Sequence, residues 1–165
     1  MSTEHKSYTD KANKDSWATP QYIFDYFNKI FNFDFDVAAS ADNAKCEDFY
    51  TIEDNALIKV WGDVNWCNPP YSNIKPWVEK AIFERMRNNK TVMLLPSDTS
   101  VEWFRLAFDN CSECIFISGR LSFINAATGK QVSGNNKGSV VFVFGDPVLQ
   151  KVKLIKRDSL YGGKK

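Results

Sequence analysis

The sequence predicts an α/β fold in which helices cover an open, mostly parallel sheet. Stretches with the apolar spacing of strands alternate along the chain with stretches of helical spacing, which is typical of such sheets. The segment Thr91–Leu95 is continuously apolar, as in a parallel strand covered on both faces. With 165 residues, of which 44% are hydrophobic, the chain is long enough for one core and too short for two ordinary domains. We therefore expect one domain of this class.

The composition excludes a membrane-spanning protein. The charged fraction is 25%, the mean hydropathy is −0.37, and no apolar run approaches the roughly 18 residues that a membrane helix needs. The polar N-terminus lacks the apolar region of a secretory signal, so we expect a cytoplasmic protein. The 21 basic and 20 acidic residues give a net charge of +1, so local charges must hold any polyanion partner.

The four cysteines predict reduced thiols rather than disulfides or a metal site. Cys111 and Cys114 form a CxxC pair, but a zinc site needs a second such pair or suitable histidines. The only histidine is His5, near the start of the chain. We therefore expect small apolar thiols and no bound metal.

The first part of the chain predicts an arm, a helix and a strand. Residues 1–15 show no periodicity and are expected to form a flexible arm. Thr19 and Pro20 predict a helix start, because threonine caps exposed amides and proline fits the first turn. Apolar residues then recur at helical spacing as far as Phe31, and alternate with polar residues from Phe31 to Val37 as in a strand. Residues 41–61 show no clear pattern.

The middle of the chain predicts a strand, a helix and a second strand. Val64–Cys67 is a short apolar run that ends at two prolines, which cannot donate to a strand ladder. Apolar residues between Ile74 and Met86 predict an amphipathic helix before the buried strand at 91–95. Thr99 and Glu102 then have the spacing of a capping box for a further helix.

The last part predicts two strands joined by a polar loop. Cys114–Ser118 and Ser139–Phe144 bracket residues 125–138, which are rich in glycine and asparagine. Because no helix pattern separates these strands, we expect an antiparallel hairpin at one edge of the sheet. The lysine-rich residues after Gly145 predict either a solvated strand and chain end or an arm that contacts phosphates.

The segment Asn68-Pro69-Pro70-Tyr71 carries the clearest chemical signal. It directly follows a predicted strand, and the ligand site of an open α/β sheet lies at the carboxyl ends of its strands. There the Asn68 carboxamide and the Pro69 carbonyl are fixed acceptors beside the aromatic ring of Tyr71. Two acceptors that take the hydrogens of adenine's planar amino group oppose delocalisation of its lone pair. The segment therefore predicts an amino-group clamp for in-line methyl transfer.

The clamp belongs to an ordered set of motifs that resembles the phage and prophage DNA adenine-N6 methyltransferases of the Dam-like class. The resemblance covers about Trp17 to Gly145. Its motifs are WATP (17–20), FDVAAS (35–40), FYTIEDNAL (49–57), WGDVNWCNPPY (61–71), WVEKAI (77–82), LLPSDTSVEWF (94–104) and ISGRLSF (117–123). It implies a Rossmann-like, S-adenosylmethionine-dependent methyltransferase fold. It also implies methylation of N6 of adenine in double-stranded DNA after base flipping.

The resemblance also assigns roles to single residues. The catalytic residues are those of the clamp. The residues expected to bind S-adenosylmethionine are Trp17, Thr19, Pro20, Asp36, Ala38, Ala39 and Asp54. Thr19 and Pro20 match the motif that contacts the methionine end of the cofactor. Asp36 matches the motif around the amino acid and ribose of the cofactor, and Asp54 is similar to the acidic residue that binds its adenine. One departure is the absence of the glycine-rich FxGxG loop that many methyltransferases use against the cofactor.

The DNA contacts are expected on loops. Phe123 is expected to pack against the flipped base, and Arg120, Lys130 and Lys137 to contact the nucleic acid. Only about two dozen residues separate the cofactor motif from the clamp, which leaves no room for a separate target-recognition domain. The predicted organisation is an arm (1–15), a catalytic domain (16–150) and a basic C-terminal tail (151–165). A short or relaxed recognition site follows as a hypothesis.

Each assignment has a structural alternative. Thr19 and Pro20 also fit a simple helix cap, and Asp36 also fits the solvent face of a strand. Asp54 also fits a turn, and Phe123 also fits a core position. The clamp by itself also fits a turn that ends a strand. For the whole protein the alternatives are a non-catalytic nucleic-acid or cofactor-binding module of the same fold, or a methyltransferase for RNA or a protein amide. The sequence leaves the oligomeric state open.

Overall fold

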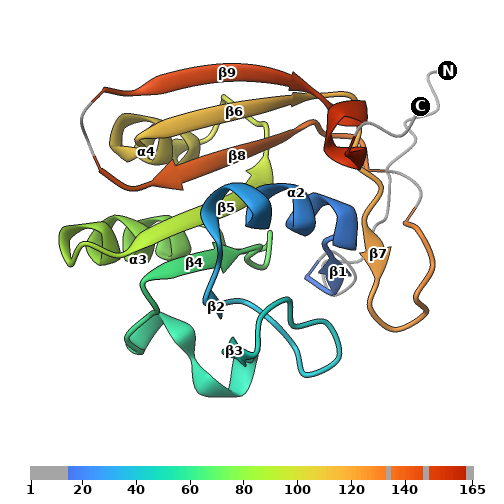
Figure 1. Cartoon of the computed structure of the whole chain (residues 1–165), viewed down its shortest axis with the longest axis horizontal. Helices are drawn as coiled ribbons and strands as arrows, with labels where there is room; N and C mark the ends of the chain where they lie inside the picture. The colour runs from blue at the N-terminus through green and yellow to red at the C-terminus, as the bar shows by residue number, and fades with distance from the viewer. Residues whose placement is uncertain (1–14, 133–134, 147–148, 163–165) are drawn as a thin grey trace, which may run out of the picture.

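A computed structural model describes residues 15–132, 135–146 and 149–162, and within them seven strands form one sheet (Figure 1). Their spatial order is β3-β2-β4-β5-β8-β6-β9. The strands are β2 (Phe35–Asp36), β3 (Asp48–Phe49), β4 (Val64–Cys67), β5 (Lys90–Pro96), β6 (Glu113–Ser118), β8 (Ser139–Phe144) and β9 (Lys151–Lys156). β8 runs antiparallel to both of its neighbours, and the other adjacent pairs are parallel. The predicted α/β class with a mostly parallel sheet is confirmed.

The remaining elements flank this sheet. A second, two-stranded antiparallel sheet pairs β1 (Trp17–Ala18) with β7 (Ile124–Asn125). The helices are α2 (Gln21–Phe31), α3 (Lys75–Met86) and α4 (Glu102–Asn110), with short 3-10 helices η1 (Ile52–Asp54), η2 (Ala56–Ile58) and η3 (Arg157–Tyr161). Among the described residues, none of the helices has the length and apolar character needed to cross a membrane.

The sheet is the middle of three layers, with α2 on one face and α3 and α4 on the other (Figure 1). Alternate side chains of β5 enter the two cores. Val92 and Leu94 join the cluster that contains the apolar face of α2, whereas Met93 and Leu95 join the cluster that contains α3 and α4. All four are fully buried, which confirms the prediction of a strand covered on both faces.

Helix α2 begins where predicted, but Thr19 does not cap it. Pro20 occupies the capping position, and no side chain of the described residues caps the helix with a hydrogen bond. The helix ends at Asn32, whose left-handed backbone (φ 57°) turns the chain, and whose amide donates to the Asn28 carbonyl. The alternating pattern from 31 to 37 therefore yields a shorter strand than predicted, Phe35–Asp36, because Phe31 still belongs to the helix.

Two further helix predictions need correction. The capping box of Thr99 and Glu102 does not form, because Val101 takes the capping position and the Glu102 carboxylate pairs with Lys75 at 3.0 Å. Helix α3 forms as expected, but its last apolar residue, Met86, is exposed and Glu84 is buried instead. A charged residue therefore occupies the core face of the helix that the apolar spacing had assigned to hydrophobic residues.

Strands β6 and β8 form the expected antiparallel pair, yet they do not lie at the edge of the sheet. Residues from the segment set apart as a basic tail form β9, which pairs in parallel with β6 and becomes the edge strand. Its side chains are largely exposed, as predicted for a solvated strand. Beyond it, Leu160 of η3 is buried in the α2-side core. The four cysteines are free thiols, and only Cys46 is partly exposed.

Candidate active site

A cavity of about 550 Å³ lies at the carboxyl ends of β2 and β4. These strands are parallel neighbours, with Asp36 aligned with Trp66, so the segments that follow them emerge side by side. β1 and the segment around η1 and η2 supply other walls. The cavity lining includes these sequence-predicted site residues: Trp17, Thr19, Asp36, Ala38, Ala39, Asn68 and Pro70. Motifs separated by up to about fifty residues in the chain therefore converge on one cavity, as expected for this fold class.

The carboxamide of Asn68 forms part of the cavity wall. Its Nδ2 donates to the Trp17 carbonyl at 3.4 Å, which leaves Oδ1 as the acceptor end of the side chain. Within the described parts of the chain, Oδ1 accepts no hydrogen bond. Pro69 is buried and Pro70 lines the cavity, and neither has an N–H that could compete for the acceptor.

Tyr71 is held from inside the protein. Its hydroxyl donates to the Leu94 carbonyl on β5 at 3.2 Å, and its ring makes an edge contact with Phe123 at 6.2 Å between centroids. Burial raises the pKa of the Tyr71 hydroxyl, so this group stays protonated. These contacts fix the ring beside the clamp, although Tyr71 is not among the residues that line the cavity.

Phe123 occupies a core position in this structure. Its side chain is only 1% exposed, and its ring stacks on Trp17 with centroids 5.7 Å apart. The Trp17 ring is partly exposed and lines the cavity. The arrangement presents Trp17 to the cavity and places Phe123 against Trp17 and Tyr71, so the structural alternative for Phe123 describes its position here.

Asp36 organises the loop that follows β2. It is 3% exposed, and its two carboxylate oxygens accept from the backbone amides of Ala38 at 3.3 Å and Lys45 at 3.0 Å. Burial raises the pKa of Asp36 to about 6, against the opposing effect of these two amides and of the Lys45 charge. Asp36 is therefore not a solvent-facing strand residue. It shapes the cavity wall in which the backbone of Ala38 and Ala39 lies.

The hydroxyl of Thr19 is buried without a partner. Thr19 is 4% exposed, lines the cavity, and its Oγ1 makes no hydrogen bond with any described residue. A buried polar atom that lacks a partner costs free energy, so a polar ligand atom in the cavity would relieve that cost. Pro20, the next residue, is buried at the start of α2 and does not line the cavity.

The structure does not bring Asp54 to the cavity. Its carboxylate accepts from the backbone amide of Thr51 at 2.8 Å and from the Thr51 hydroxyl at 3.1 Å, which caps η1. The backbone amide of Thr51 is the main cause that lowers the pKa of Asp54. The local turn predicted as its structural alternative is what forms, and its neighbours Thr51, Ile52 and Asn55 line the cavity instead.

The three basic residues predicted to contact nucleic acid are exposed on loops outside the cavity. Arg120 donates to the Asn135 carbonyl at 3.5 Å, and Lys130 lies in the turn after β7. Lys137 pairs with Asp98 at 2.6 Å, and this contact is the main cause that lowers the pKa of Asp98 to about 2. Arg120 follows β6 and Lys137 precedes the antiparallel β8, so both loops lie at the same edge of the sheet as the cavity.

Sequence reasoning missed several cavity residues. Asp15 was assigned to the arm, yet its carboxylate accepts from the backbone amide of Ser72 at 3.0 Å and from its hydroxyl at 2.6 Å. Both residues line the cavity. They lie 57 positions apart, and neither carries a local pattern that indicates the contact. The rest of the predicted arm, including His5, lies outside the described residues.

The fold and the site define a class of α/β proteins in which a cavity adjoins an Asn-Pro-Pro-Tyr segment at the carboxyl edge of the sheet. Comparison with known protein families identifies the family of this chain. It belongs to the DNA N-6-adenine-methyltransferase (Dam) family, whose model matches residues 6–160.

Two phage proteins are similar to the chain over most of its length. The DNA N-6-adenine-methyltransferase of Escherichia phage T1 is 42% identical over 153 residues, which cover 82% of this chain and 64% of the phage protein. The DNA N-6-adenine-methyltransferase of Haemophilus phage HP1 (strain HP1c1) is 43% identical over 144 residues, which cover 84% of this chain and 83% of its relative. The match thus spans slightly less than two thirds of the T1 protein.

Proposed function

We propose that this protein transfers the methyl group of S-adenosylmethionine to the N6 amino group of adenine in DNA. The observation that carries the proposal is the position of Asn68. Asn68 lines a cavity large enough for a small-molecule ligand, and the bond from its Nδ2 to the Trp17 carbonyl leaves Oδ1 as the acceptor of its side chain. The names of the two phage relatives support adenine in DNA as the target.

The residues of the cavity fit S-adenosylmethionine. The volume of about 550 Å³ lies within the usual range for small-molecule sites, and the unpartnered Thr19 hydroxyl supplies a polar group for a ligand. Trp17, Thr19, Asp36, Ala38 and Ala39 are the residues that we propose hold it, with Pro20 fixing the start of α2 beside Thr19. When bound, the cofactor supplies a methyl group on a positively charged sulfur.

The clamp is proposed to act on the amino group of the target base. Asn68 Oδ1 and the Pro69 carbonyl accept its two hydrogens, which favours a tetrahedral nitrogen with its lone pair available for attack. Tyr71 supplies an aromatic surface for the base, and its hydroxyl bond to Leu94 keeps the ring in place. Extruding adenine from the duplex costs a few kcal/mol, which stacking helps to offset. The nitrogen loses its proton only after it becomes cationic, so no strong base is needed.

DNA is proposed to lie across the loops at the carboxyl edge of the sheet. The net charge of +1 requires local attraction, and Arg120 and Lys130 supply exposed cations there. Lys137 is partly neutralised by Asp98, so we expect its contribution to be smaller. The loop 135–138 is tied to the segment after β6 by the bond from Asn135 Nδ2 to the Leu121 carbonyl. Recognition by such loops, without a separate domain, supports a short or relaxed site.

The test is transfer of labelled methyl from S-adenosylmethionine to unmethylated duplex DNA, followed by nucleoside analysis. RNA, a glutamine-containing protein substrate and a reaction without acceptor are run in parallel. We expect label on N6 of adenine in DNA, loss of that label in Asn68→Ala, and its retention in Asn73→Ala, an exposed asparagine of the same region.

Each other result contradicts the proposal in a defined way. Label on RNA alone, or on protein alone, would show that the substrate is that molecule and not DNA. Cofactor binding without transfer to any acceptor would indicate a non-catalytic binding module. Equal activity of Asn68→Ala and the unmodified protein would remove the clamp from the mechanism.

A further inference from the structure

The segment Asp15–Ala18, here called the strap, connects two parts of the active-site region. On one side it pairs with β7: Trp17 is aligned with Asn125, and the Ala126 amide donates to the Ser16 carbonyl at 3.1 Å. On the other side it contacts the loop Asn68–Ser72, here called the clamp loop. The strap thus lies between β7 and the residues proposed to hold the amino group.

The strap binds the clamp loop at both of its ends. At the first residue, Asn68 Nδ2 donates to the Trp17 carbonyl at 3.4 Å. At the last, the Asp15 carboxylate accepts from the amide of Ser72 at 3.0 Å and from its hydroxyl at 2.6 Å. The two contacts come from residues two positions apart on the strap and four positions apart on the clamp loop.

The clamp loop needs such external support because its own backbone offers few donors. Pro69 and Pro70 have no N–H, so the loop cannot continue the ladder of β4. Within the described residues, the bonds that hold it to other elements are those from the strap and the hydroxyl bond of Tyr71 to the Leu94 carbonyl. The Tyr71 bond fixes the ring, whereas the strap fixes the two ends of the loop.

We propose that Asp15 is a positioning residue: through Ser72 it holds the clamp loop where Asn68 Nδ2 meets the Trp17 carbonyl and Asn68 Oδ1 is left as the acceptor. This proposal rests on the proposed function of the clamp. Asp15 does not act on the methyl group or the amino group. Its effect is geometric, and displacement of a reacting group by about 1 Å can cost up to about 100-fold in rate.

Variants of Asp15 and Ser72 test whether Asp15 positions the clamp loop. Asp15→Ala removes both bonds to Ser72, and Ser72→Ala removes the hydroxyl bond alone. Asp15→Asn keeps both contacts, because its Oδ1 accepts from the Ser72 amide and its Nδ2 donates to the Ser72 hydroxyl. Asp42→Ala, an exposed aspartate in the loop after β2, is the matched control.

The kinetic measurement is kcat with saturating DNA and S-adenosylmethionine, together with KM for each. We expect kcat to fall about 10-fold in Asp15→Ala, with KM values changed less than about threefold, and to stay near that of the unmodified protein in Asp15→Asn and Asp42→Ala. The double variant Asp15→Ala/Ser72→Ala should be no slower than Asp15→Ala alone, because the two residues act through one contact. Additive losses, or a change confined to KM for S-adenosylmethionine, would overturn the proposal.

A second measurement does not depend on catalysis. Amide hydrogen exchange of residues 68–74 in the free protein should be at least about fivefold faster in Asp15→Ala than in Asp42→Ala, with equal melting temperatures. Unchanged exchange would overturn the proposed positioning role of Asp15 even if the protein is an active methyltransferase. If the unmodified protein methylates no DNA but Asp15→Ala loosens this segment, the proposed function fails and the positioning contact stands.

Discussion

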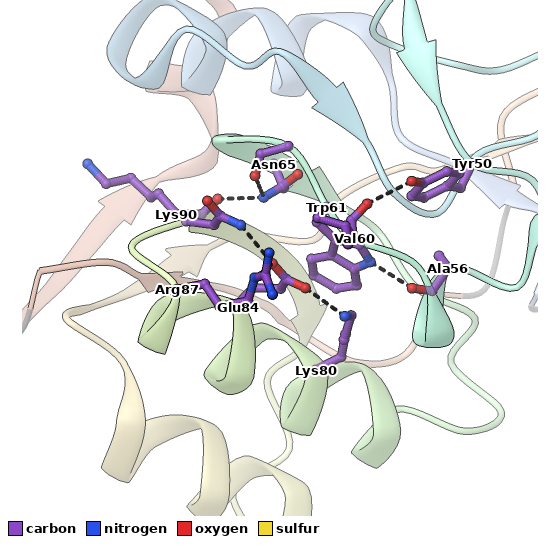
Figure 2. Close-up of polar contacts among 11 residues, drawn as sticks. Tyr50, Ala56, Val60, Trp61, Asn65, Lys80, Glu84, Arg87 and Lys90 are labelled. Carbon is purple, nitrogen blue, oxygen red and sulfur yellow. Dashed lines mark hydrogen bonds and ion pairs between the residues drawn. The ribbon is translucent and has the colours of Figure 1, made fainter.

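Asn65 and Asn68 lie three residues apart, within and directly after β4, and the structure uses their carboxamides differently. At the amino end of the strand, Asn65 is fully buried and its Nδ2 donates to the carbonyls of Gly62 at 2.8 Å and Lys90 at 3.0 Å (Figure 2). At the carboxyl end, Asn68 is partly exposed and makes one longer bond, at 3.4 Å, beside a cavity. The first carboxamide ties together two backbone segments and leaves its Oδ1 buried without a hydrogen-bond partner among the described residues, whereas the second lies beside a cavity where its Oδ1 can meet a ligand.

The surroundings of the two asparagines differ in the same way. Near Asn65, the buried carboxylate of Glu84 pairs with Lys80 at 2.6 Å and accepts from Asn89 at 2.7 Å, and the Lys80 ammonium lies 5.7 Å from the centre of the Trp61 ring (Figure 2). These interactions connect α3 to the segments around β4. The amino end of the sheet is thus held by charges that neutralise one another inside the protein.

Unpartnered buried atoms occur at both ends, so their meaning depends on whether they adjoin a cavity. The hydroxyls of Thr19 and Thr91 are both buried without a hydrogen-bond partner in the described parts of the chain. Thr19 lines the proposed cofactor cavity, whereas Thr91 points from β5 into the α3 side of the sheet and does not line that cavity. The comparison teaches that an orphaned polar atom indicates a ligand only where space for that ligand exists.

The largest expected effect separates the two asparagines. Asn68→Ala should lower the rate of methyl transfer by about 10³-fold, comparable to the loss of one pre-organised group that stabilises a transition state, with little change in the free energy of unfolding. Asn65→Ala should do the reverse and cost about 1–3 kcal/mol of stability, because two backbone carbonyls lose a buried donor. Urea unfolding and turnover per folded molecule measure both. Equal losses of activity in the two variants would abolish the distinction.

The second-largest expected effect tests the buried ion pair of Glu84 and Lys80 at the amino end of the sheet. Glu84→Ala should lower the free energy of unfolding by about 3 kcal/mol, because it leaves the largely buried Lys80 without its counter-charge. The matched control is Glu79→Ala, an exposed glutamate on the same helix, for which we expect a change within about 0.5 kcal/mol. Activity of the folded Glu84→Ala protein should be retained. A rate loss without a loss of stability would show that the network reaches the active site.

The third effect is a pH dependence at the carboxyl end. The pKa of Asp36 is about 6 in the folded protein against an ordinary value of 3.8. Between about pH 4 and pH 6 the folded state therefore holds more protons, so the free energy of unfolding falls as the pH rises and levels off above pH 6. The difference between the two pKa values corresponds to about 2–3 kcal/mol.

Urea unfolding between pH 4 and pH 8 measures this dependence. Asp36→Asn should lack that fall, because asparagine does not titrate. If the two proteins show the same slope between pH 4 and pH 6, the burial of Asp36 does not carry the pH dependence.

The smallest effect concerns the two orphaned hydroxyls. Thr19→Val and Thr91→Val should each stabilise the unliganded protein by about 1 kcal/mol, because a methyl group replaces an unbonded buried hydroxyl of similar size. Only Thr19→Val should also weaken S-adenosylmethionine binding, by about five- to tenfold, as calorimetry can measure. Equal affinities of the two variants would remove Thr19 from the cofactor site.

Most of the fold was predictable because strong local patterns specify it. The buried strand at 91–95 and the short strand at 64–67 form as expected, since their apolar character and the following prolines depend on neighbouring residues. The position of β9 was not predictable, because an edge strand with exposed lysines resembles a solvated tail in sequence. The buried Glu84 was equally hidden, since its partner Asn89 comes from the turn after the helix.

The site shows the same division. Asn68, Asp36 and Thr19, which the sequence motifs assigned to the site, all line one cavity. These residues lie at strand ends or next to a helix start, where the fold class determines their position. Asp54 does not line the cavity, because its carboxylate accepts from the local backbone amide of Thr51, and the sequence alone does not settle whether such a local bond forms. The contact between Asp15 and Ser72 depends on the final packing of distant segments, and no periodicity announces it.

The position of β8 has a consequence for how the chain folds. This strand is the only described link between β3-β2-β4-β5 and β6-β9, and its residues, 139–144, follow both neighbours in the sequence. During synthesis the sheet β3-β2-β4-β5 and the strand β6 stay unconnected, and β5 and β6 each have a free edge, until this late segment arrives. Free edges of this kind pair readily with other chains, and contacts distant in sequence form slowly. A nascent chain that stops before Ser139 therefore exposes the free edge of β5 and the unpaired strand β6, and both can pair with other chains.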